Sequence, residues 1–302
     1  MVRSSLVISL LFVLALSVQA QPRKILIAHR GASGLAPEHT VAAYKLAMEH
    51  KADFVEPDLG VTKDNVLVCL HDDTLERTTN VAEVFPNRMS KVEMRQPGPH
   101  WLALDFTVAE IKRLDAGKWF KPEYAGQRVP TFQEMIELVR SRPGTGIYPE
   151  LKSPELYTSR NIDQVKLFVE QVKKNGLEKP ESLKVMPVII QSFDEEAIRR
   201  VARELPTIPR VFLTSRDEDV TEARLKELKT FATGIAPEKK LVAAHPEMVK
   251  LAHDLGLTVT CWTFRADEKT SFASVKDEMS NFLYTLGIDA LFTNNPDQFP
   301  RR

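Results

Sequence analysis

The chain has 302 residues, 43% of them hydrophobic and 27% charged, a composition that excludes a disordered or fibrous protein. Its 41 basic and 41 acidic residues balance, which argues against a surface built to hold nucleic acid or anionic membrane. Two cysteines cannot make a disulfide framework, so a hydrophobic core must stabilise one large domain or two ordinary ones.

The first twenty residues have the pattern of a secretory signal peptide. Arg3 precedes an apolar run at positions 6–18, and small residues lead to a cleavage position after Ala20. The run is shorter than the roughly 20 residues that a membrane-spanning helix needs. We therefore expect export to the periplasm or the medium, with no stable membrane insertion.

Short β-branched runs alternate with longer helical patterns along the rest of the chain. They predict eight strands, at residues 25–29, 54–59, 146–151, 188–192, 210–214, 233–236, 257–262 and 289–293. Eight strands alternating with helices predict an α/β fold of the closed TIM (β/α)8 barrel type. An open doubly wound sheet is the alternative, but no Gly-x-Gly-x-x-Gly turn follows any of these strands.

Helix boundaries are indicated by capping residues between the strands. Capping boxes are predicted at the residue pairs Thr107/Glu110, Thr131/Glu134 and Ser192/Glu195. Pro246 suits a first helical position, and Gly176 and Gly256 suit the left-handed residue that ends a helix.

The second strand is followed by a departure from this alternation. The link that starts at Leu59 is too short for a parallel crossover, so residues 67–71 should fold back as a hairpin arm. Residues 73–128 then form a small insertion, which we expect to lie over the mouth of the barrel. We interpret residues 21–302 as one domain that includes this insertion.

Charged residues stand at the carboxyl ends of several otherwise apolar strands. Glu56 and Asp58 are two apart on the second strand, and Glu150 and Lys152 on the third, so each pair shares a face. The carboxyl ends of the strands form the rim where such barrels build their active sites. Buried charges of this kind are costly unless they are paired or bind a metal.

Three converging carboxylates raise one another's pKa values unless a cation lies between them. An all-oxygen site formed by Glu56, Asp58 and Glu150 suits Ca²⁺ or Mg²⁺ better than zinc. The alternative is a set of ion pairs with Arg30 and Lys152 that stabilises the barrel mouth without a metal. The three strand ends taken together favour the metal.

Two histidines complete the candidate site. His29 ends the first strand and His71 ends the hairpin arm, and a pair of imidazoles can divide general acid and general base work. The other histidines, at positions 39, 50, 100, 245 and 253, are predicted to have surface or packing roles. Cys69 and Cys261 are predicted to be separate buried thiols, because their strands are far apart around a barrel.

These motifs together resemble a known family. They are His29-Arg-Gly-Ala-Ser-Gly-x-x-Pro-Glu-His-Thr40, Glu56-x-Asp58, Thr62-Lys-Asp, His71-Asp72, Leu114-Asp-Ala-Gly-Lys-Trp-Phe120, Val129-Pro-Thr-Phe132, Glu150-Leu-Lys152, Trp262-Thr-Phe-Arg265 and Leu291-Phe-Thr-Asn-Asn-Pro296. Their order is that of the glycerophosphodiester phosphodiesterases, specifically the exported bacterial type within the PLC-like phosphodiesterase superfamily. The resemblance covers nearly the whole chain after the signal segment.

The resemblance implies a metal-dependent phosphodiesterase on a TIM barrel. Its substrates would be small glycerophosphodiesters, such as glycerophosphocholine or glycerophosphoethanolamine, and its products sn-glycerol 3-phosphate and an alcohol. One divalent cation is implied, with Ca²⁺ expected and Mg²⁺ the alternative. The implied roles are a catalytic pair at His29 and His71, metal ligands at Glu56, Asp58 and Glu150, phosphate binding by Arg30 and Lys152, and glycerol packing against Trp262.

Several points stay open at the level of sequence. We assign His29 as the base and His71 as the acid, but the reverse fits equally, and Asp72 either orients a neighbouring group or caps a loop. Water can attack directly, or the glycerol 2-hydroxyl can attack first and give a cyclic phosphate. The sequence does not identify the oligomeric state.

Two residues depart from the family pattern. His39 stands where the family more often has Asn, and an additional titratable group there could tune the pH dependence. Pro57 lacks a backbone donor, so we expect a local bulge that leaves both carboxylates on one face.

Two other functions remain as alternatives. A phospholipase of the same barrel type would act on intact lipids through an apolar lip. Trp119 and Phe120 could supply such a lip, but the resemblance assigns both to the substrate pocket. A binding protein without activity would have no need of both histidines and all three carboxylates.

Overall fold

The computed structural model describes residues 23–90 and 98–301, and the predicted signal segment lies outside them. Within these residues the strands form one sheet with the order β4-β3-β6-β7-β8-β9-β10-β11-β1-β2-β5. The strands are β1 (Ile25–His29), β2 (Phe54–Glu56), β3 (Asp58–Val61), β4 (Leu67–Cys69), β5 (Gly146–Ile147), β6 (Glu150–Leu151), β7 (Ile190–Ser192), β8 (Arg210–Thr214), β9 (Gly234–Pro237), β10 (Thr258–Phe264) and β11 (Ala290–Thr293).

The sheet closes into a barrel although two of its strands are interrupted. β2 and β3 are halves of one strand separated by Pro57, and β5 and β6 are halves of the next. The Tyr148 N–H donates to the Val55 carbonyl and the Glu150 N–H to the Pro57 carbonyl, both at 2.9 Å, so the parallel ladder crosses both interruptions. Since β11 pairs with β1 and β1 with β2, eight parallel strands form a closed ring.

The barrel and its strand positions confirm the sequence prediction. β1 and β8 have the predicted bounds, while the second and third strands are each split. Pro57 causes the first split because proline has no N–H to donate to the ladder. β4 pairs antiparallel with β3, as the predicted hairpin arm requires.

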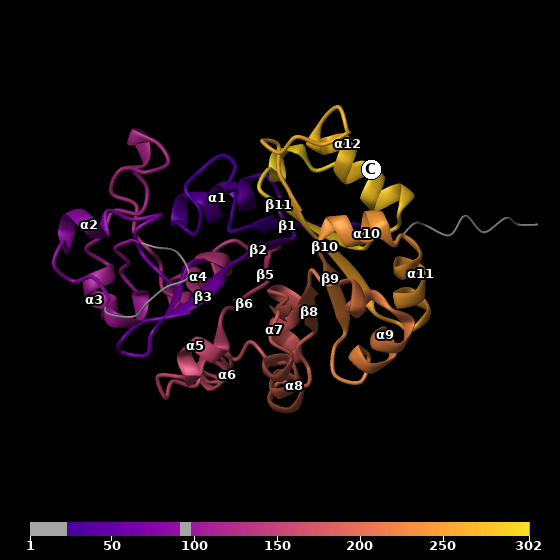
Figure 1. The fold of residues 1–302 in the computed structure, drawn as a ribbon, viewed down its shortest axis with the longest axis horizontal. Coiled ribbons are helices and arrows are strands. Elements are labelled where there is room, and N and C mark those ends of the chain that lie inside the picture. The colour runs from indigo at the N-terminus through magenta and orange to yellow at the C-terminus, as the bar shows by residue number, and fades with distance from the viewer. Residues whose placement is uncertain (1–22, 91–97, 302) are drawn as a thin grey trace, which may run out of the picture.

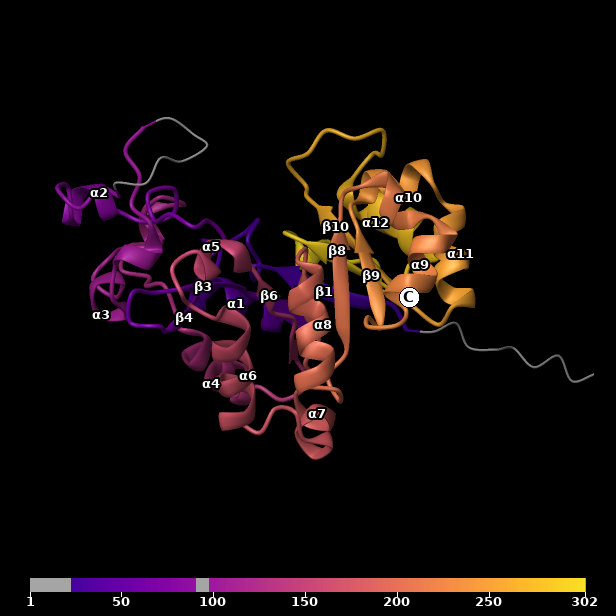
Figure 2. The ribbon, with the colours of Figure 1, turned by 60° about the horizontal axis from the view of Figure 1, so that its bottom comes forward.

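Most of the helices surround the ring of strands (Figure 1). The helices are α1 (Val41–Glu49), α2 (Val81–Val84), α3 (Val108–Ile111), α4 (Phe132–Arg140), α5 (Pro154–Thr158), α6 (Gln164–Lys174), α7 (Pro180–Val185), α8 (Glu195–Glu204), α9 (Glu222–Leu228), α10 (Lys239–Ala244), α11 (Glu247–Asp254) and α12 (Val275–Ser280). Helices α2 and α3 lie instead to one side of the ring, with the inserted segment (Figure 1). Helices α9, α10 and α11 lie outside β9 and β10 (Figure 2). Across the described ranges 23–90 and 98–301, no helix is both long and apolar enough to cross a bilayer.

Two of the three predicted capping boxes are present, at the starts of α3 and α4. The third is wrong, because Asp194 caps α8 through the Ala197 N–H. The Ser192 hydroxyl instead donates to the Leu151 carbonyl at 2.8 Å and accepts from the Asp194 N–H at 3.0 Å, so it joins two strands.

The remaining predicted boundary residues lie close to their expected places. Pro246 precedes α11 by one residue. Gly176 and Gly256 follow α6 and α11 with left-handed φ angles of 62° and 72°, as predicted for residues that end helices.

Three hydrophobic clusters stabilise this arrangement. One fills the barrel interior and includes Ile27, Tyr148 and Phe292, and a larger one packs the helices onto the strands. A third cluster joins β4 to residues 75–129 around Leu75 and Phe106. The inserted segment therefore has its own small core, and its position over the barrel mouth stays a prediction.

Both cysteines are free and buried, as predicted.

Candidate active site

A cavity of about 280 Å³ opens where the strands of the barrel end. The side chains that line it include His29, Arg30, Glu56, His71, Glu150, Lys152 and Trp262. They come from β1, β2, β6, β10 and the ends of β4 and β6, which places them at the carboxyl rim of the barrel. Seven of the eight residues predicted for the site thus line one cavity, and the eighth, Asp58, lies among the carboxylates below it.

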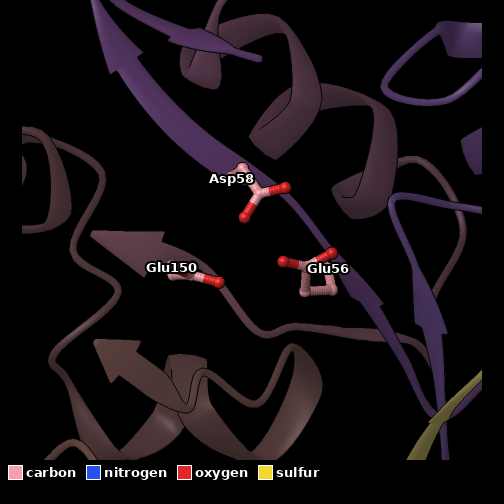
Figure 3. Close-up of side chains that lie close together, drawn as sticks. All are labelled: Glu56, Asp58 and Glu150. Atoms are coloured by element: carbon pink, nitrogen blue, oxygen red, sulfur yellow. The ribbon is translucent and has the colours of Figure 1, made fainter. Parts of the chain in front are cut away.

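Glu56, Asp58 and Glu150 point toward one another (Figure 3). Each offers one carboxylate oxygen, and these three oxygens all lie within 4.8 Å of one another. The exposed fractions of the three residues are 1%, 1% and 7%. The backbone fixes this proximity, because Asp58 and Glu150 are register partners across β3 and β6. The three side chains form the acidic triad.

Burial and mutual repulsion govern the protonation of the acidic triad. Burial, followed by the charges of Asp58 and Glu150, raises the pKa of Glu56 well above its usual value. Burial and the Asp58 charge likewise raise the pKa of Glu150 to about 8. Burial alone would also raise the pKa of Asp58. A hydrogen bond from His39 and the charge of Arg30 outweigh this effect of burial and hold the pKa of Asp58 well below 3.8.

Two cations contact the acidic triad. Arg30 Nε lies 3.2 Å from Asp58 Oδ2, and Lys152 Nζ lies 3.3 Å from Glu150 Oε1. Arg30 is also shared with Glu38, at 3.1 Å. The ion pairs expected in the metal-free interpretation are therefore present, but two cations do not balance three buried carboxylates. The donor set fits a divalent cation, which favours oxygen ligands.

The turn after β1 brings a backbone donor to the same place. Arg30 has a φ of 58°, and its N–H donates to Glu56 Oε2 at 2.8 Å. Gly31 follows with a φ of 81°, and a Cβ there would lie 2.7 Å from the carbonyl carbon of Ala43. The glycine is therefore required for the turn to approach α1.

His29 has an amide partner that fixes its ring. Its Nδ1 lies 2.7 Å from Asn294 Oδ1, an atom that can only accept, so Nδ1 carries the proton and Nε2 is left as an acceptor. Burial, together with the charge of Arg30, holds the pKa of His29 well below 6.5. The ring is therefore neutral near pH 7.

His71 has a carboxylate partner. Its Nδ1 donates to Asp72 Oδ1 at 2.6 Å, and Arg77 binds the other Asp72 oxygen. Its Nε2 lies 3.3 Å from Lys152 Nζ, a donor, so this nitrogen accepts. Asp72 thus orients a neighbouring group, which was one of the two interpretations left open. Burial alone would raise the pKa of Asp72, but His71 and Arg77 lower it well below its usual value.

The prediction for His39 is wrong, because this residue is part of the site rather than a general packing residue. It is 4% exposed, and its Nε2 lies 2.9 Å from Asp58 Oδ2. A carboxylate only accepts, so Nε2 donates and Nδ1 accepts from the Tyr44 hydroxyl at 2.8 Å. His39 therefore orients one carboxylate of the acidic triad. The sequence signal was its place in the first motif, where it replaces Asn.

The other histidines lie outside the cavity. His100 bonds Glu76, His245 bonds Asp217 and His253 bonds Asp289. His50 caps the end of α1. Their predicted surface and packing roles agree with these positions.

An apolar wall faces the charged side chains. Trp262 packs edge-to-face on Phe193 with ring centroids 5.6 Å apart, and Leu213 and Phe292 line the cavity beside it. The indole Nε1 donates to the Ala236 carbonyl at 2.8 Å, which fixes the ring. Trp119 is 42% exposed, and neither Trp119 nor Phe120 is among the described residues that line this cavity. Their assignment to the substrate pocket is therefore not supported.

Comparison with known proteins agrees with this geometry. The sequence profile of the Glycerophosphoryl diester phosphodiesterase family matches residues 29–298. The Bacillus subtilis glycerophosphodiester phosphodiesterase is 36% identical, with 92% of this chain and 86% of the relative covered. The enzyme of that name from Caldanaerobacter subterraneus is 30% identical, over 91% of this chain and 96% of the relative.

A solved structure has a similar fold. The phosphodiesterase of Oleispira antarctica, in complex with the product sn-glycerol-3-phosphate, superposes with a TM-score of 0.72 and is 27% identical. The superposition covers 92% of this chain and 95% of that one. The closed barrel, the paired histidines, the acidic triad and a profile match over most of the chain lead to one conclusion: this protein belongs to the glycerophosphodiester phosphodiesterase family.

Proposed function

We propose that the protein hydrolyses glycerophosphodiesters, such as glycerophosphocholine and glycerophosphoethanolamine, to sn-glycerol 3-phosphate and an alcohol. The observation that carries this proposal is the convergence of two imidazoles, two cations and the acidic triad, two members of which line the cavity, in a chain of this family. A phosphodiester anion resists attack because of its charge, and this cavity concentrates the groups that neutralise it.

The acidic triad would hold one divalent cation. We propose Ca²⁺, with Mg²⁺ as the alternative, because both prefer carboxylate oxygens and the triad offers no nitrogen or sulfur. When bound, such a cation supplies charge neutralisation on the phosphoryl oxygens. Arg30 and Lys152, which line the same cavity, would bind the phosphate from either side.

The hydrogen-bond partners of the histidines support His29 as the base and His71 as the acid. The neutral ring of His29 presents an acceptor nitrogen to the cavity, and its amide partner adds no charge. Asp72 places a negative charge beside His71, which suits a ring that must hold a proton for transfer. Binding of the phosphate by Lys152 would free His71 Nε2 to carry that proton.

A chelation and rescue assay tests the function. Purified protein is treated with a chelator, supplied with Ca²⁺ or Mg²⁺, and offered glycerophosphocholine, with sn-glycerol 3-phosphate as the readout. We expect the chelator to abolish activity and the added cation to restore it. Folded His29→Ala and His71→Ala variants should be inactive under all of these conditions. Undiminished turnover in saturating chelator would contradict the metal assignment. Absence of turnover of every glycerophosphodiester would leave the binding-protein alternative.

The phospholipase alternative requires a contiguous apolar surface to meet a membrane. The large exposed hydrophobic residues of the described chain are few: Met89 and Trp119 in the inserted segment, Val185 at the end of α7 and Phe193 beside Trp262. We favour small soluble diesters, because the matching family and its relatives are named for glycerophosphodiesters. Comparison of glycerophosphocholine with phosphatidylcholine liposomes separates the two, since a phospholipase would release head group from the liposomes.

We further propose that the protein is exported and cleaved after Ala20. The support is the basic and apolar pattern of the first twenty residues. N-terminal sequencing of protein recovered outside the cytoplasm should begin at Gln21, and recovery of an uncleaved cytoplasmic chain would contradict the proposal.

A further inference from the structure

Gln191 is a buried amide in the wall of the active-site cavity to which nothing above gives a role. It lies on β7, in register with Glu150 on β6, and is 2% exposed. Its Oε1 has no hydrogen-bond partner among the described residues. A buried polar atom without a partner is costly, and such an atom in a cavity wall indicates a ligand that completes its bonding.

Among the described residues that line the cavity, only Gln191 Oε1 and Arg30 Nε are buried side-chain polar atoms without a hydrogen-bond partner. The Arg30 Nε also makes no hydrogen bond, but it lies 3.2 Å from Asp58 in an ion pair. The Trp262 Nε1 is used by the Ala236 carbonyl. Gln191 therefore has the unmet hydrogen-bonding capacity that a ligand would satisfy.

The position of Gln191 separates it from the acidic triad. β6 lies between β3 and β7, so Gln191 is on the far side of Glu150 from Asp58. Apart from Arg265, which is exposed, the side chains that line the cavity beyond it on that side are uncharged, and they include Leu213, Trp262 and Phe292. A part of the substrate bound here would be neutral, with carbon atoms against the apolar wall and a hydroxyl near the amide.

We propose that Gln191 is a specificity-determining residue that hydrogen-bonds a hydroxyl group of the glycerol half of the substrate. A carboxamide both donates and accepts, which matches the two functions of a hydroxyl. The carbon skeleton of glycerol would then lie along Trp262 while the phosphate faces Arg30 and Lys152. This inference rests on the proposed function, because it deepens the account of the same site.

The experiment compares two diesters in a Gln191→Met variant, which keeps the length of the side chain and removes its polar end. The substrates are glycerophosphocholine and bis(p-nitrophenyl) phosphate, which has no hydroxyl for Gln191 to bind. We expect kcat/KM for glycerophosphocholine to fall about tenfold. The value for bis(p-nitrophenyl) phosphate and the calcium concentration for half-maximal activity should stay within twofold of those of the wild type.

Gln164 provides a matched control. It is also 2% exposed with an unpartnered Oε1, but it lies on α6, where its Nε2 donates to the Leu59 carbonyl at 2.7 Å. Gln164→Met should change thermal stability without changing the ratio of the two kcat/KM values. Equal losses for both diesters in Gln191→Met, or no loss for glycerophosphocholine, would overturn the proposal.

Product binding gives a second readout that does not depend on turnover. In calorimetric titrations with calcium present, Gln191→Met should bind sn-glycerol 3-phosphate about tenfold more weakly than the wild type. Its affinity for inorganic phosphate should be unchanged. The wild type could hydrolyse no glycerophosphodiester and yet bind sn-glycerol 3-phosphate about tenfold more tightly than Gln191→Met does. That result would refute the proposed function and support the role of Gln191. Equal weakening of both ligands would refute that role, and Gln191→Leu repeats the test if the methionine variant does not fold.

Discussion

Replacement of His39 with alanine should weaken the metal site without altering the residues that touch the substrate. His39 donates to Asp58 Oδ2 at 2.9 Å and does not itself line the cavity. Without it, the Asp58 carboxylate keeps the Arg30 contact at 3.2 Å but loses the donor that fixes its orientation. Groups that orient a metal ligand in this way typically contribute a factor of about 10 to 100 in metal affinity.

Two independent estimates give the same size of effect. A loss of 10- to 100-fold in affinity corresponds to about 1.4 to 2.8 kcal/mol. A hydrogen bond to a charged acceptor contributes about 1.5 to 3 kcal/mol. The range applies fully because both His39 and Asp58 are buried, with exposed fractions of 4% and 1%.

Calorimetric titration of metal-free protein with calcium measures this effect directly, and circular dichroism shows whether the variant is folded. We expect His39→Ala to bind calcium 10- to 100-fold more weakly, with kcat at saturating calcium within a few-fold of wild type. His39→Asn should recover part of the loss, because its amide also donates. Tyr44→Phe, which removes only the 2.8 Å bond to Nδ1, should cost less. Unchanged calcium affinity in folded His39→Ala would refute the reasoning.

Three further outcomes are expected. Asp72→Asn should lower kcat at least tenfold while leaving calcium affinity unchanged, because it removes the charge that holds the His71 ring; equal kcat would contradict this. Although burial raises the pKa of Glu38, Arg77 and Arg30 outweigh it and lower the pKa from 4.5 to about 2, so stability present above pH 4.5 should be lost as pH falls through 2. Of the full linked loss of about 3 kcal/mol, about 2 kcal/mol should appear between pH 6 and pH 3 in urea unfolding, and it should be absent from Glu38→Gln. Calcium at about 100 times its Kd should add about 2.7 kcal/mol to stability at pH 8, seen as a higher Tm that Glu56→Gln largely abolishes.

Sequence reasoning found the barrel and the acidic triad because both depend on local patterns. β-branched runs mark the strands, and side chains two residues apart share a face, which placed Glu56 beside Asp58. The pairing of Asp58 with Glu150 then follows from the adjacency of consecutive parallel strands. A local bulge at Pro57 was expected because proline cannot donate to the ladder, and the structure instead has a break in the strand there.

The residues that were missed depend on contacts between distant parts of the chain. His39 lies in the loop before α1 with a left-handed φ of 56°, and its ring contacts the Asp58 carboxylate on β3. No periodic pattern reports such a contact. Gln191 stands beside Ser192 at the end of an otherwise apolar run, and only the closed barrel shows that its amide oxygen has no partner. Ser192 was misread as a cap because its bond to Leu151 spans two strands.

The closed barrel divides the cavity into two halves with different chemistry. Apart from the exposed Arg265, which follows β10, the charged groups come from the first three barrel strands and the hairpin arm, whereas Gln191, Leu213, Trp262 and Phe292 come from later strands. The charged half gathers repelling carboxylates, an arrangement that the surrounding core must hold against its electrostatic cost. It would bind the phosphate common to every diester, while the neutral half meets the carbon skeleton that differs among them. Substitutions in the first half should therefore reduce turnover of all phosphodiesters, and those in the second should change the preference among them.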